Sequence, residues 1–313
     1  MNDLSISAKD VTMNRKATPT SSNGEALRCL LCKSESNRLV GTDEAFKLRR
    51  CALCGFTFHR DFTTDSEVRE YYDHYYHDEN LAFSAITEAR FRELITSFER
   101  YRESNRILDV GCGSGHFLKV AKDNEWRTYG TEIASGAMDQ LSSLGITGFC
   151  GELQAAAYAA EFFDVIYCSE VIEHVLDPFA LLGEIARVLR RDGMLYLTTP
   201  NYDSLSRRLL GFKWRNIALE HISYFTPRTI SRALGEAGFR KIGASTRNID
   251  PYELKKVFIR SHRDSGSGFQ IARTDNFREH LESNRTLRAA KNLANVLLRA
   301  TAMGDTIVVR AEK

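Results

Sequence analysis

The chain has 313 residues, of which 43% are hydrophobic and 27% charged, and its formal net charge at pH 7 is +2. This composition is typical of a soluble globular protein with one large domain or two smaller ones. The small net charge excludes a general electrostatic attraction to nucleic acid or anionic lipid. No apolar run approaches the ~20 residues that a membrane helix requires.

Residues 1–26 predict a disordered tail. The segment is polar, is rich in Ser, Thr and Asn, and lacks the apolar run of a signal peptide. We therefore expect a cytoplasmic protein, and the reducing cytoplasm disfavours disulfides among its seven cysteines.

Residues 27–62 predict a small zinc module. Two pairs of cysteines each enclose two residues, and 18 residues separate the pairs: Cys29 and Cys32, then Cys51 and Cys54. Two such pairs supply the four thiolates of a tetrahedral Zn²⁺ site. Because four protein ligands leave no open coordination position, we expect the metal to hold the segment together rather than to take part in catalysis.

Other residues near the module leave further roles open. His59 is a weaker, fifth candidate ligand, and arginines around the second pair could hold nucleic acid, although neighbouring acidic residues offset their charge. The remaining cysteines, Cys112, Cys150 and Cys168, are expected to be small buried residues.

Residues 63–104 predict a helical cap or linker. The first part is acidic and rich in tyrosine, including Tyr72 and Tyr76. The second part has apolar residues at helical spacing between Glu88 and Arg102, which predicts an amphipathic helix.

From residue 105 to 313 the pattern predicts an α/β domain. Apolar strands alternate with helices, and this rhythm is typical of a doubly wound, Rossmann-like parallel sheet. Seven strands are expected, at 107–110, 127–130, 147–150, 164–168, 194–199, 241–246 and 307–309. Thr226 and Pro227 predict the cap and first residue of a helix. The region 252–303 predicts a helical insertion that could form a lid or an oligomer contact.

A glycine-rich turn after the first strand predicts a cofactor site. The strand beginning at Ile107 runs into Gly111, Gly113 and Gly115, and a helix follows. Glycines allow the backbone to turn sharply and to approach a ligand closely. NAD, FAD and S-adenosylmethionine sites all use such turns, and a plain strand-to-helix turn is the simplest alternative. Glu132, at the end of the second strand, could accept hydrogen bonds from both ribose hydroxyls, which argues against NADP.

The stretch Leu108-Asp-Val-Gly-Cys-Gly-Ser-Gly115 resembles the first motif of class I S-adenosylmethionine-dependent methyltransferases. Later stretches beginning at Phe163, Ser169 and Arg191 resemble further motifs of that family, so the resemblance is close over 106–201 and looser to the end of the chain. Zinc knuckles followed by a tyrosine-rich segment also resemble bacterial sugar methyltransferases, including sugar C-methyltransferases.

The resemblance implies a set of residues around the cofactor. The glycines would border the methionine part of the cofactor, and Asp109 would border its ammonium group. Glu132 would contact the ribose, and the adenine would be flanked by Ile133, Glu152 and Leu153. Ser169 and Glu170 would face the donor methyl. The implied set is Asp109, Gly111, Gly113, Gly115, Glu132, Ile133, Glu152, Leu153, Ser169, Glu170, Tyr72 and Tyr76. The two tyrosines would cap the cofactor, or would serve only as aromatic packing between the modules.

The acceptor site is expected after the fourth and fifth strands. Methyl transfer often requires a base, and histidine is suited to that task near neutral pH. The resemblance favours His221 as the base, with His174 and Glu173 as further catalytic candidates; each histidine could instead be structural. Together with Glu170 these side chains could hold a divalent cation, an arrangement that resembles quinone-pathway and small-RNA O-methyltransferases.

The sequence therefore predicts methyl transfer to a small molecule, foremost a sugar or nucleotide-sugar. An RNA or quinone-type O-methyltransferase and a non-catalytic binding module remain alternatives. Resembling sugar C-methyltransferases carry a further C-terminal domain, whereas this chain ends at the predicted last strand, so O-methylation is expected at least as much as C-methylation. The oligomeric state stays undetermined.

Overall fold

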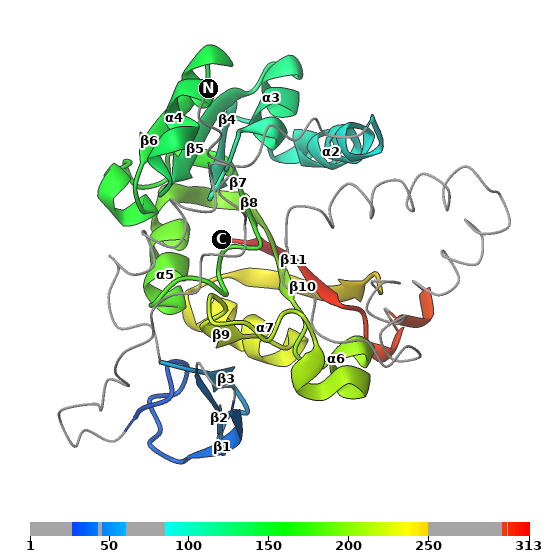
Figure 1. The fold of residues 1–313 in the computed structure, drawn as a ribbon. Coiled ribbons are helices and arrows are strands. Elements are labelled where there is room, and N and C mark those ends of the chain that lie inside the picture. The colour runs from blue at the N-terminus through cyan, green and yellow to red at the C-terminus, as the bar shows by residue number, and fades with distance from the viewer. Residues whose placement is uncertain (1–26, 43–45, 61–84, 250–295, 299) are drawn as a thin grey trace, which may run out of the picture.

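The computed structural model describes residues 27–42, 46–60, 85–249, 296–298 and 300–313. The predicted tail, Tyr72, Tyr76 and most of the predicted insertion at 252–303 lie outside these residues. Two sheets are present in the described part: a large one that carries most of the chain, and a small one at its base (Figure 1).

The large sheet has seven strands in the order β10-β11-β8-β7-β4-β5-β6. Their bounds are β4 (Arg106–Val110), β5 (Arg127–Glu132), β6 (Thr147–Cys150), β7 (Phe163–Ser169), β8 (Leu189–Pro200), β10 (Arg240–Arg247) and β11 (Thr306–Glu312). Strands β4 to β8 are parallel, and β11 is antiparallel to both of its neighbours. This α/β, Rossmann-like sheet confirms the predicted fold class and all seven predicted strands.

Helices cover both faces of this sheet. Their bounds are α2 (Ala85–Phe98), α3 (His116–Asp123), α4 (Met138–Ser143), α5 (Pro178–Val188), α6 (Leu205–Leu210) and α7 (Pro227–Glu236), with 3-10 turns at Glu99–Tyr101, Ser135–Ala137, Leu153–Ala156 and Gly211–Lys213. Side chains alternate along a strand, so Val165 packs with α2 to α4 on one face, whereas Ile166 packs with α5 and α7 on the other.

Local chemistry explains where several elements begin and end. Thr226 caps α7 by accepting a hydrogen bond from the Thr229 backbone N–H, and Pro227 follows as the first helical residue, as predicted. Asp192 and Gly193 lie inside β8, where β8 carries extra residues opposite β7 and its pairing register shifts. Asp192 has a φ of 56°, consistent with this local irregularity.

The small sheet combines the cysteine segment with a strand from the part of the chain that forms the large sheet. Its strands, all antiparallel, are β1 (Asn37–Thr42), β2 (Lys47–Cys51), β3 (Thr57–Phe58) and β9 (Ser223–Tyr224), in the order β1-β2-β3-β9. Thus β9 comes from the segment after β8 of the large sheet, and Figure 1 shows it beside the blue strands of the cysteine segment.

Two further sequence expectations can be compared with this fold. Cys112 and Cys168 are buried, as expected, but Cys150 is exposed because β6 is the edge strand of the large sheet. No helix among the residues that the structure describes is long and apolar enough to cross a membrane.

Candidate functional site

The two cysteine pairs form matching turns. In each turn the residue after the second cysteine, Lys33 or Gly55, has a positive φ, of 60° and 78°. Its backbone N–H donates to the carbonyl of the first cysteine, at 2.9 Å to Cys29 and 3.1 Å to Cys51. Each first cysteine also donates its N–H to the residue five positions later. The sequence spacing therefore folds into two equivalent knuckles.

The four thiols converge on one point. Sulfur atoms from different knuckles lie 3.5 Å apart, Cys29 to Cys54 and Cys32 to Cys51, and all four lie within 4.8 Å of one another. A tetrahedral Zn²⁺ with Zn–S bonds of about 2.3 Å requires sulfur separations of about 3.8 Å, so these residues fit the ion. Burial raises the pKa of the Cys51 thiol, but the backbone N–H groups of Cys54 and Leu53 outweigh this effect and lower it to about 7.

His59 does not belong to this group of four. Its side chain is fully buried, and its ring lies 4.7 Å from that of Phe46. The hypothesis that it supplies a fifth ligand is therefore not supported, and its surroundings are considered again below.

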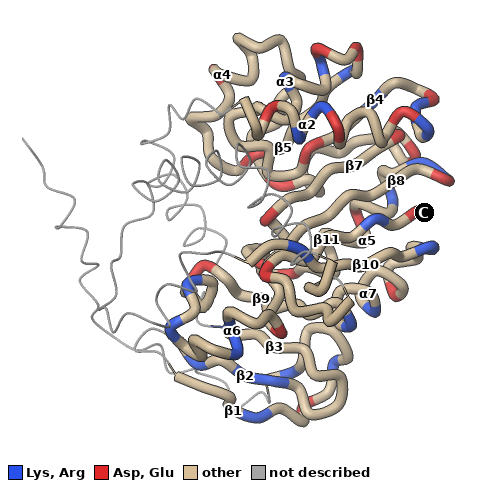
Figure 2. Tube along the Cα trace, turned by 90° about the vertical axis from the view of Figure 1, so that its right-hand side faces the viewer, with Lys and Arg blue, Asp and Glu red and all other residues tan. Residues whose placement is uncertain are grey.

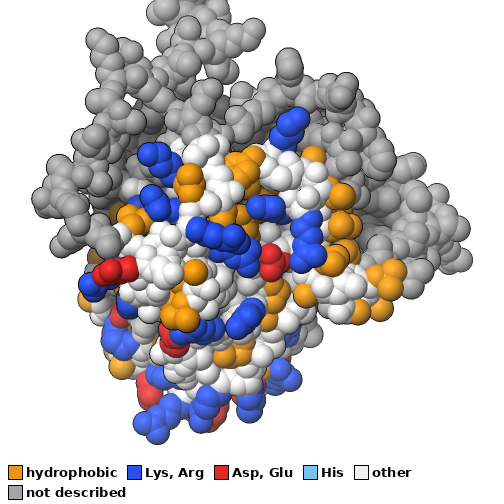
Figure 3. Space-filling view, turned by 90° about the horizontal axis from the view of Figure 1, so that it is seen from below, with side chains coloured by type: hydrophobic (Ala, Val, Ile, Leu, Met, Phe, Trp, Pro, Cys, Tyr) orange, Lys and Arg blue, Asp and Glu red, His pale blue; other side chains and the backbone are white. Residues whose placement is uncertain are grey.

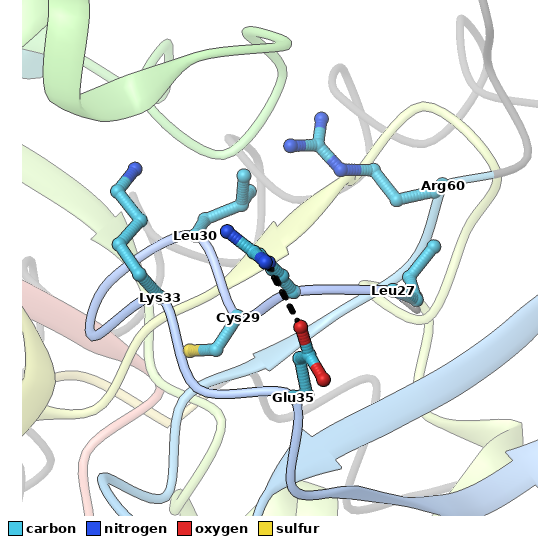
Figure 4. A pocket seen from close by; sticks show the side chains of 7 residues that line it. Leu27, Cys29, Leu30, Lys33, Glu35 and Arg60 are labelled. Atoms are coloured by element: carbon cyan, nitrogen blue, oxygen red, sulfur yellow. Dashed lines mark hydrogen bonds and ion pairs between the residues drawn. The ribbon is translucent and has the colours of Figure 1, made fainter. Parts of the chain in front are cut away.

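A pocket of about 580 Å³ lies on the outer side of the first knuckle (Figure 4). Its polar lining includes Arg28, which forms an ion pair with Glu35 at 3.0 Å, and Arg60, which donates to the Leu176 carbonyl at 2.9 Å. The lining includes none of the residues implied for the cofactor, so this pocket is separate from the cofactor edge described next.

The glycine-rich turn lies at the carboxyl end of β4 and has the expected strained backbone. Gly111, Gly113 and Gly115 have φ values of 68°, 51° and 77°. A Cβ atom on Gly111 would lie 2.5 Å from Val171 Cγ2, so only glycine fits there without displacing the next strand's loop. The N–H groups of Gly111 and Cys112 both donate to the Thr131 carbonyl on β5, which fixes the turn against the neighbouring strand.

Glu132 occupies the end of β5, next to that turn. Its two carboxylate oxygens accept from the backbone N–H of Gly113 at 2.9 Å and of Ala134 at 3.0 Å. Asp109 is buried at the end of β4, and burial together with the charge of Glu132 raises its pKa well above the ordinary value. The two carboxyl groups and the glycine turn therefore form one continuous edge.

The remaining residues implied for the cofactor extend this edge on either side. After β6, Glu152 is exposed and Leu153 is buried, and Ile133 follows Glu132 in a half-buried position. After β7, Ser169 Oγ lies 2.7 Å from Thr198 Oγ1, which also donates to Glu170 at 2.8 Å. Thr198 was not among the predicted site residues. The sequence feature that could have indicated it is a pair of polar residues at the carboxyl end of an otherwise apolar strand.

His174 and His221 meet beyond the carboxyl end of β7. Their ring centroids are 4.5 Å apart, with the rings near perpendicular. His174 Nδ1 lies 3.1 Å from the Glu220 carbonyl and His221 Nδ1 lies 2.8 Å from the Asn216 carbonyl. Because a carbonyl can only accept, each Nδ1 carries the proton and each Nε2 carries the lone pair when the ring is neutral.

Glu173 completes this cluster. It is 1% exposed, and one of its oxygens accepts from Thr199 Oγ1 at 2.9 Å. The other oxygen, Oε1, lies 3.8 Å from His174 Nε2. Ligand atoms of Glu173, His174 and His221 all lie within 4.8 Å of one another, whereas Glu170 is not part of this group.

Burial controls the charge of the cluster. It lowers the pKa of His174 to about 4, and burial together with the nearby His174 lowers the pKa of His221 to about 3. Burial also raises the pKa of Glu173 well above its ordinary range, with a further contribution from Glu170. Both imidazoles are therefore neutral at physiological pH.

Comparison with known proteins identifies the family. A family model described as a methyltransferase domain matches residues 72–243, which is more than half of the chain. The chain belongs to this methyltransferase family. The matched residues include strands β4 to β8 of the large sheet.

Two curated relatives carry the name ubiquinone biosynthesis O-methyltransferase. The ubiquinone biosynthesis O-methyltransferase of Parvibaculum lavamentivorans is 32% identical over 136 residues, covering 40% of this chain and 50% of that protein. The enzyme of the same name from Coxiella burnetii is 24% identical over 132 residues, covering 40% and 54%. The chain thus spans about half the length of these relatives.

A solved structure aligns with part of the chain. A methyltransferase from Archaeoglobus fulgidus, described as dependent on S-adenosylmethionine, aligns with a TM-score of 0.49 and 22% identity. The alignment covers 73% of this chain and 93% of that one.

Proposed function

We propose that this methyltransferase transfers the methyl group to a hydroxyl oxygen of a small-molecule acceptor held beside His174 and His221. The observation that carries the proposal is the orientation of the two imidazoles. Each donates Nδ1–H to a backbone carbonyl, which leaves both Nε2 lone pairs beside the carboxylate of Glu173. Open α/β sheets bind their ligands at this carboxyl edge.

In the proposed reaction, the acceptor oxygen attacks the methyl carbon as the bond from that carbon to the cofactor sulfur breaks. The hydroxyl proton passes to His221 Nε2, and the products are a methyl ether and S-adenosylhomocysteine. The carbonyl of Asn216 holds the ring in the tautomer that can accept this proton. His174 and Glu173 hold the acceptor beside it, because alignment of the reactants supplies much of the rate enhancement.

The cofactor would lie along the edge formed by β4, β5 and β6. We infer that Gly111, Gly113 and Gly115 border its methionine part, that Asp109 faces the ammonium group, and that Glu132 accepts from the ribose hydroxyls. Ile133, Glu152 and Leu153 would flank the adenine, and Ser169 and Glu170 the donor methyl. The positive φ angles of the glycines and the fixed carboxylate of Glu132 support this arrangement.

A divalent cation at Glu173, His174 and His221 is a second candidate that specific observations favour. A low pKa weakens His221 as a base, and the Glu173 carboxylate is buried with Oε1 making no hydrogen bond. Neutral imidazoles and a carboxylate form a ligand set that suits such ions. When bound, the ion would bring two acceptor hydroxyls together and acidify them. Loss of activity on treatment with a chelator that leaves the zinc site loaded would support this candidate.

The acceptor class follows from the same site. A pair of adjacent hydroxyls is common to a sugar and to a dihydroxylated aromatic ring, and these correspond to the two small-molecule classes that the sequence favours.

The cysteine segment also has a basic surface, since the residues described in 27–60 include seven Lys or Arg and one Glu. Lys and Arg gather on β1, β2 and α6, and many lie on the face seen from below (Figures 2 and 3). RNA therefore belongs in any panel of test acceptors.

The experiment is a methyl-transfer assay with radiolabelled S-adenosylmethionine and three acceptors: a thymidine-diphosphate deoxysugar, 3,4-dihydroxybenzoate and a single-stranded RNA. We expect a small molecule to be methylated on oxygen and RNA to be unmodified. RNA methylation in the absence of small-molecule methylation would overturn the proposed acceptor class.

The division of the chain is also proposed: a tail at 1–26, a zinc module at 27–62, a helical cap at 63–104 and the catalytic domain at 105–313. The paired cysteine turns support the second of these, and the extent of the large sheet supports the last.

A further inference from the structure

The cysteine module is joined to the catalytic domain by backbone hydrogen bonds. Strand β3 pairs with β9 at two positions, Thr57 with Tyr224 and Phe58 with Ser223. The pairing continues one residue further, where the His59 N–H donates to the Ile222 carbonyl at 3.1 Å. Strand β9 directly follows His221, so the module lies beside the chain that carries this histidine.

The other edge of the same chain is bonded to the acceptor site. The backbone N–H groups of Ile222 and Ser223 both donate to the Glu173 carbonyl, at 2.8 and 3.0 Å. The residues that follow His221 are therefore held between Glu173 on one side and β3 on the other. A displacement of β3 would remove one of the two contacts that fix His221 relative to Glu173.

The position of β3 depends on the second knuckle. The Cys51 N–H donates to the Phe56 carbonyl at 2.9 Å, and Phe56 immediately precedes β3. The Phe56 side chain is fully buried and packs against Phe225, with ring centroids 5.2 Å apart, just after β9. Metal binding at the cysteines is thus connected to β9 through one short, fully buried segment.

His59 directly follows β3, at the point where the module is bonded to Ile222. It is fully buried, and its ring packs against Phe46 of the module. On the other side, its backbone N–H is bonded to the carbonyl of Ile222, the residue directly after His221. Phe46 also belongs to an apolar cluster with Trp214 and Ile217, from the segment that leads to His221.

We propose that the zinc-loaded module forms a wall of the acceptor site and that His59 is a positioning residue for His221. The module would then do more than stabilise its own fold: zinc binding would be required for a competent acceptor site but not for cofactor binding. This inference rests on the proposed function, because it takes the cluster around His221 to be the place where the acceptor binds.

The first experiment measures hydrogen exchange in the full chain, with zinc bound and after zinc has been removed with a chelator. We expect the amides of Ile222 and Ser223 to exchange at least tenfold faster without zinc. Without β3 this segment is held on one side only, so its hydrogen bonds to the Glu173 carbonyl open more often. Amides of β4 and the affinity for S-adenosylhomocysteine should not change. Equal exchange at Ile222 and Ser223 in both states would overturn the proposal, and so would loss of S-adenosylhomocysteine binding together with zinc. No acceptor is needed, so this result is independent of the proposed function.

The second experiment compares His59→Phe, His59→Gln and Thr57→Val. Thr57 is a matched control, because it is equally buried in the same strand and its hydroxyl makes no hydrogen bond. The acceptor is 3,4-dihydroxybenzoate or the thymidine-diphosphate deoxysugar, whichever the wild type methylates faster. We expect His59→Phe to lower kcat at least tenfold, with unchanged KM for S-adenosylmethionine and unchanged zinc content. His59→Gln should recover part of the lost kcat. Thr57→Val should have the kcat of the wild type.

Wild-type kcat in His59→Phe would overturn the role of His59. The same assay on His221→Ala separates the two hypotheses. If His221→Ala is fully active, the proposed function fails; if it is inactive while His59→Phe is fully active, only the present inference fails.

Discussion

The edge of the sheet proposed for the cofactor and the edge proposed for the acceptor are built in different ways. The cofactor edge uses the ends of β4, β5 and β6, which follow one another in the chain, and its groups are fixed by nearby backbone, such as Gly113 and Ala134 around Glu132. The acceptor edge brings together His59, Glu173 and His221, which are far apart in sequence and held by hydrogen bonds between separate segments. Changes at the first edge should therefore act on cofactor affinity, and changes at the second on turnover.

The largest expected effect is at His221. Replacement by alanine removes the proposed base and should lower kcat by about 10²- to 10⁴-fold. Affinity for S-adenosylhomocysteine should be unchanged, because the cofactor edge does not include this residue. Glu236→Gln on the exposed side of α7 is the control, with wild-type kcat expected. An undiminished kcat in His221→Ala would remove this histidine from the mechanism.

At the opposite edge, Glu132→Ala should weaken binding of S-adenosylhomocysteine. Hydrogen bonds to a charged group contribute about 1.5–3 kcal/mol, or roughly a 10- to 150-fold change in Kd. Calorimetric titration measures the effect, with Asp139→Asn, an exposed acid on α4, as the matched control. If Glu132→Ala and Asp139→Asn bind equally well, the ribose role of Glu132 is wrong.

Gly111→Ala tests the backbone of the cofactor edge. Its φ of 68° and the 2.5 Å approach to Val171 mean that a Cβ atom introduces both strain and a clash. Such strain costs about 1–3 kcal/mol, which should lower Tm and cofactor affinity together. Gly183→Ala, on α5 with open space around it, should have neither effect. Equal Tm values for the two variants would contradict the conformational argument.

The smallest effect concerns pH. His174 and His221 have pKa values lowered to about 4 and 3 by burial, whereas an unfolded histidine titrates near 6.5. Between these values the unfolded chain binds more protons than the folded one, so stability should decrease as pH falls from about 6.5 towards 4. Denaturant titrations at pH 7 and pH 5 should show this for the wild type and less of it for His174→Gln. A pH dependence that this substitution does not alter would show that His174 is not buried in the neutral form.

Sequence reasoning was effective for structural features that depend on local pattern. The glycines at 111–115, Glu132 and the seven strands could be predicted because turn chemistry and strand periodicity are properties of short segments. The grouping of the four cysteines could also be predicted from the sequence, since their spacing determines the two turns.

The rest depends on contacts between distant segments. From the sequence, His59 could be interpreted only as a candidate ligand, because nothing local indicates that β3 pairs with β9 about 165 residues later in the chain. Contacts between distant segments also determine the buried hydrogen bond from Thr199 to Glu173 and the exposure of Cys150 at a sheet edge. Sheet order and burial are set by the whole fold.

The most direct test of the account is calorimetric titration of the purified chain with S-adenosylhomocysteine, together with elemental analysis for zinc. The account predicts saturable binding of one S-adenosylhomocysteine per chain and about one zinc ion per chain, which would show that the cofactor edge and the cysteine cluster are separate, singly occupied sites. Absence of binding by folded protein that is free of copurified cofactor would contradict the assignment of the cofactor edge, and absence of zinc would contradict that of the cysteine cluster.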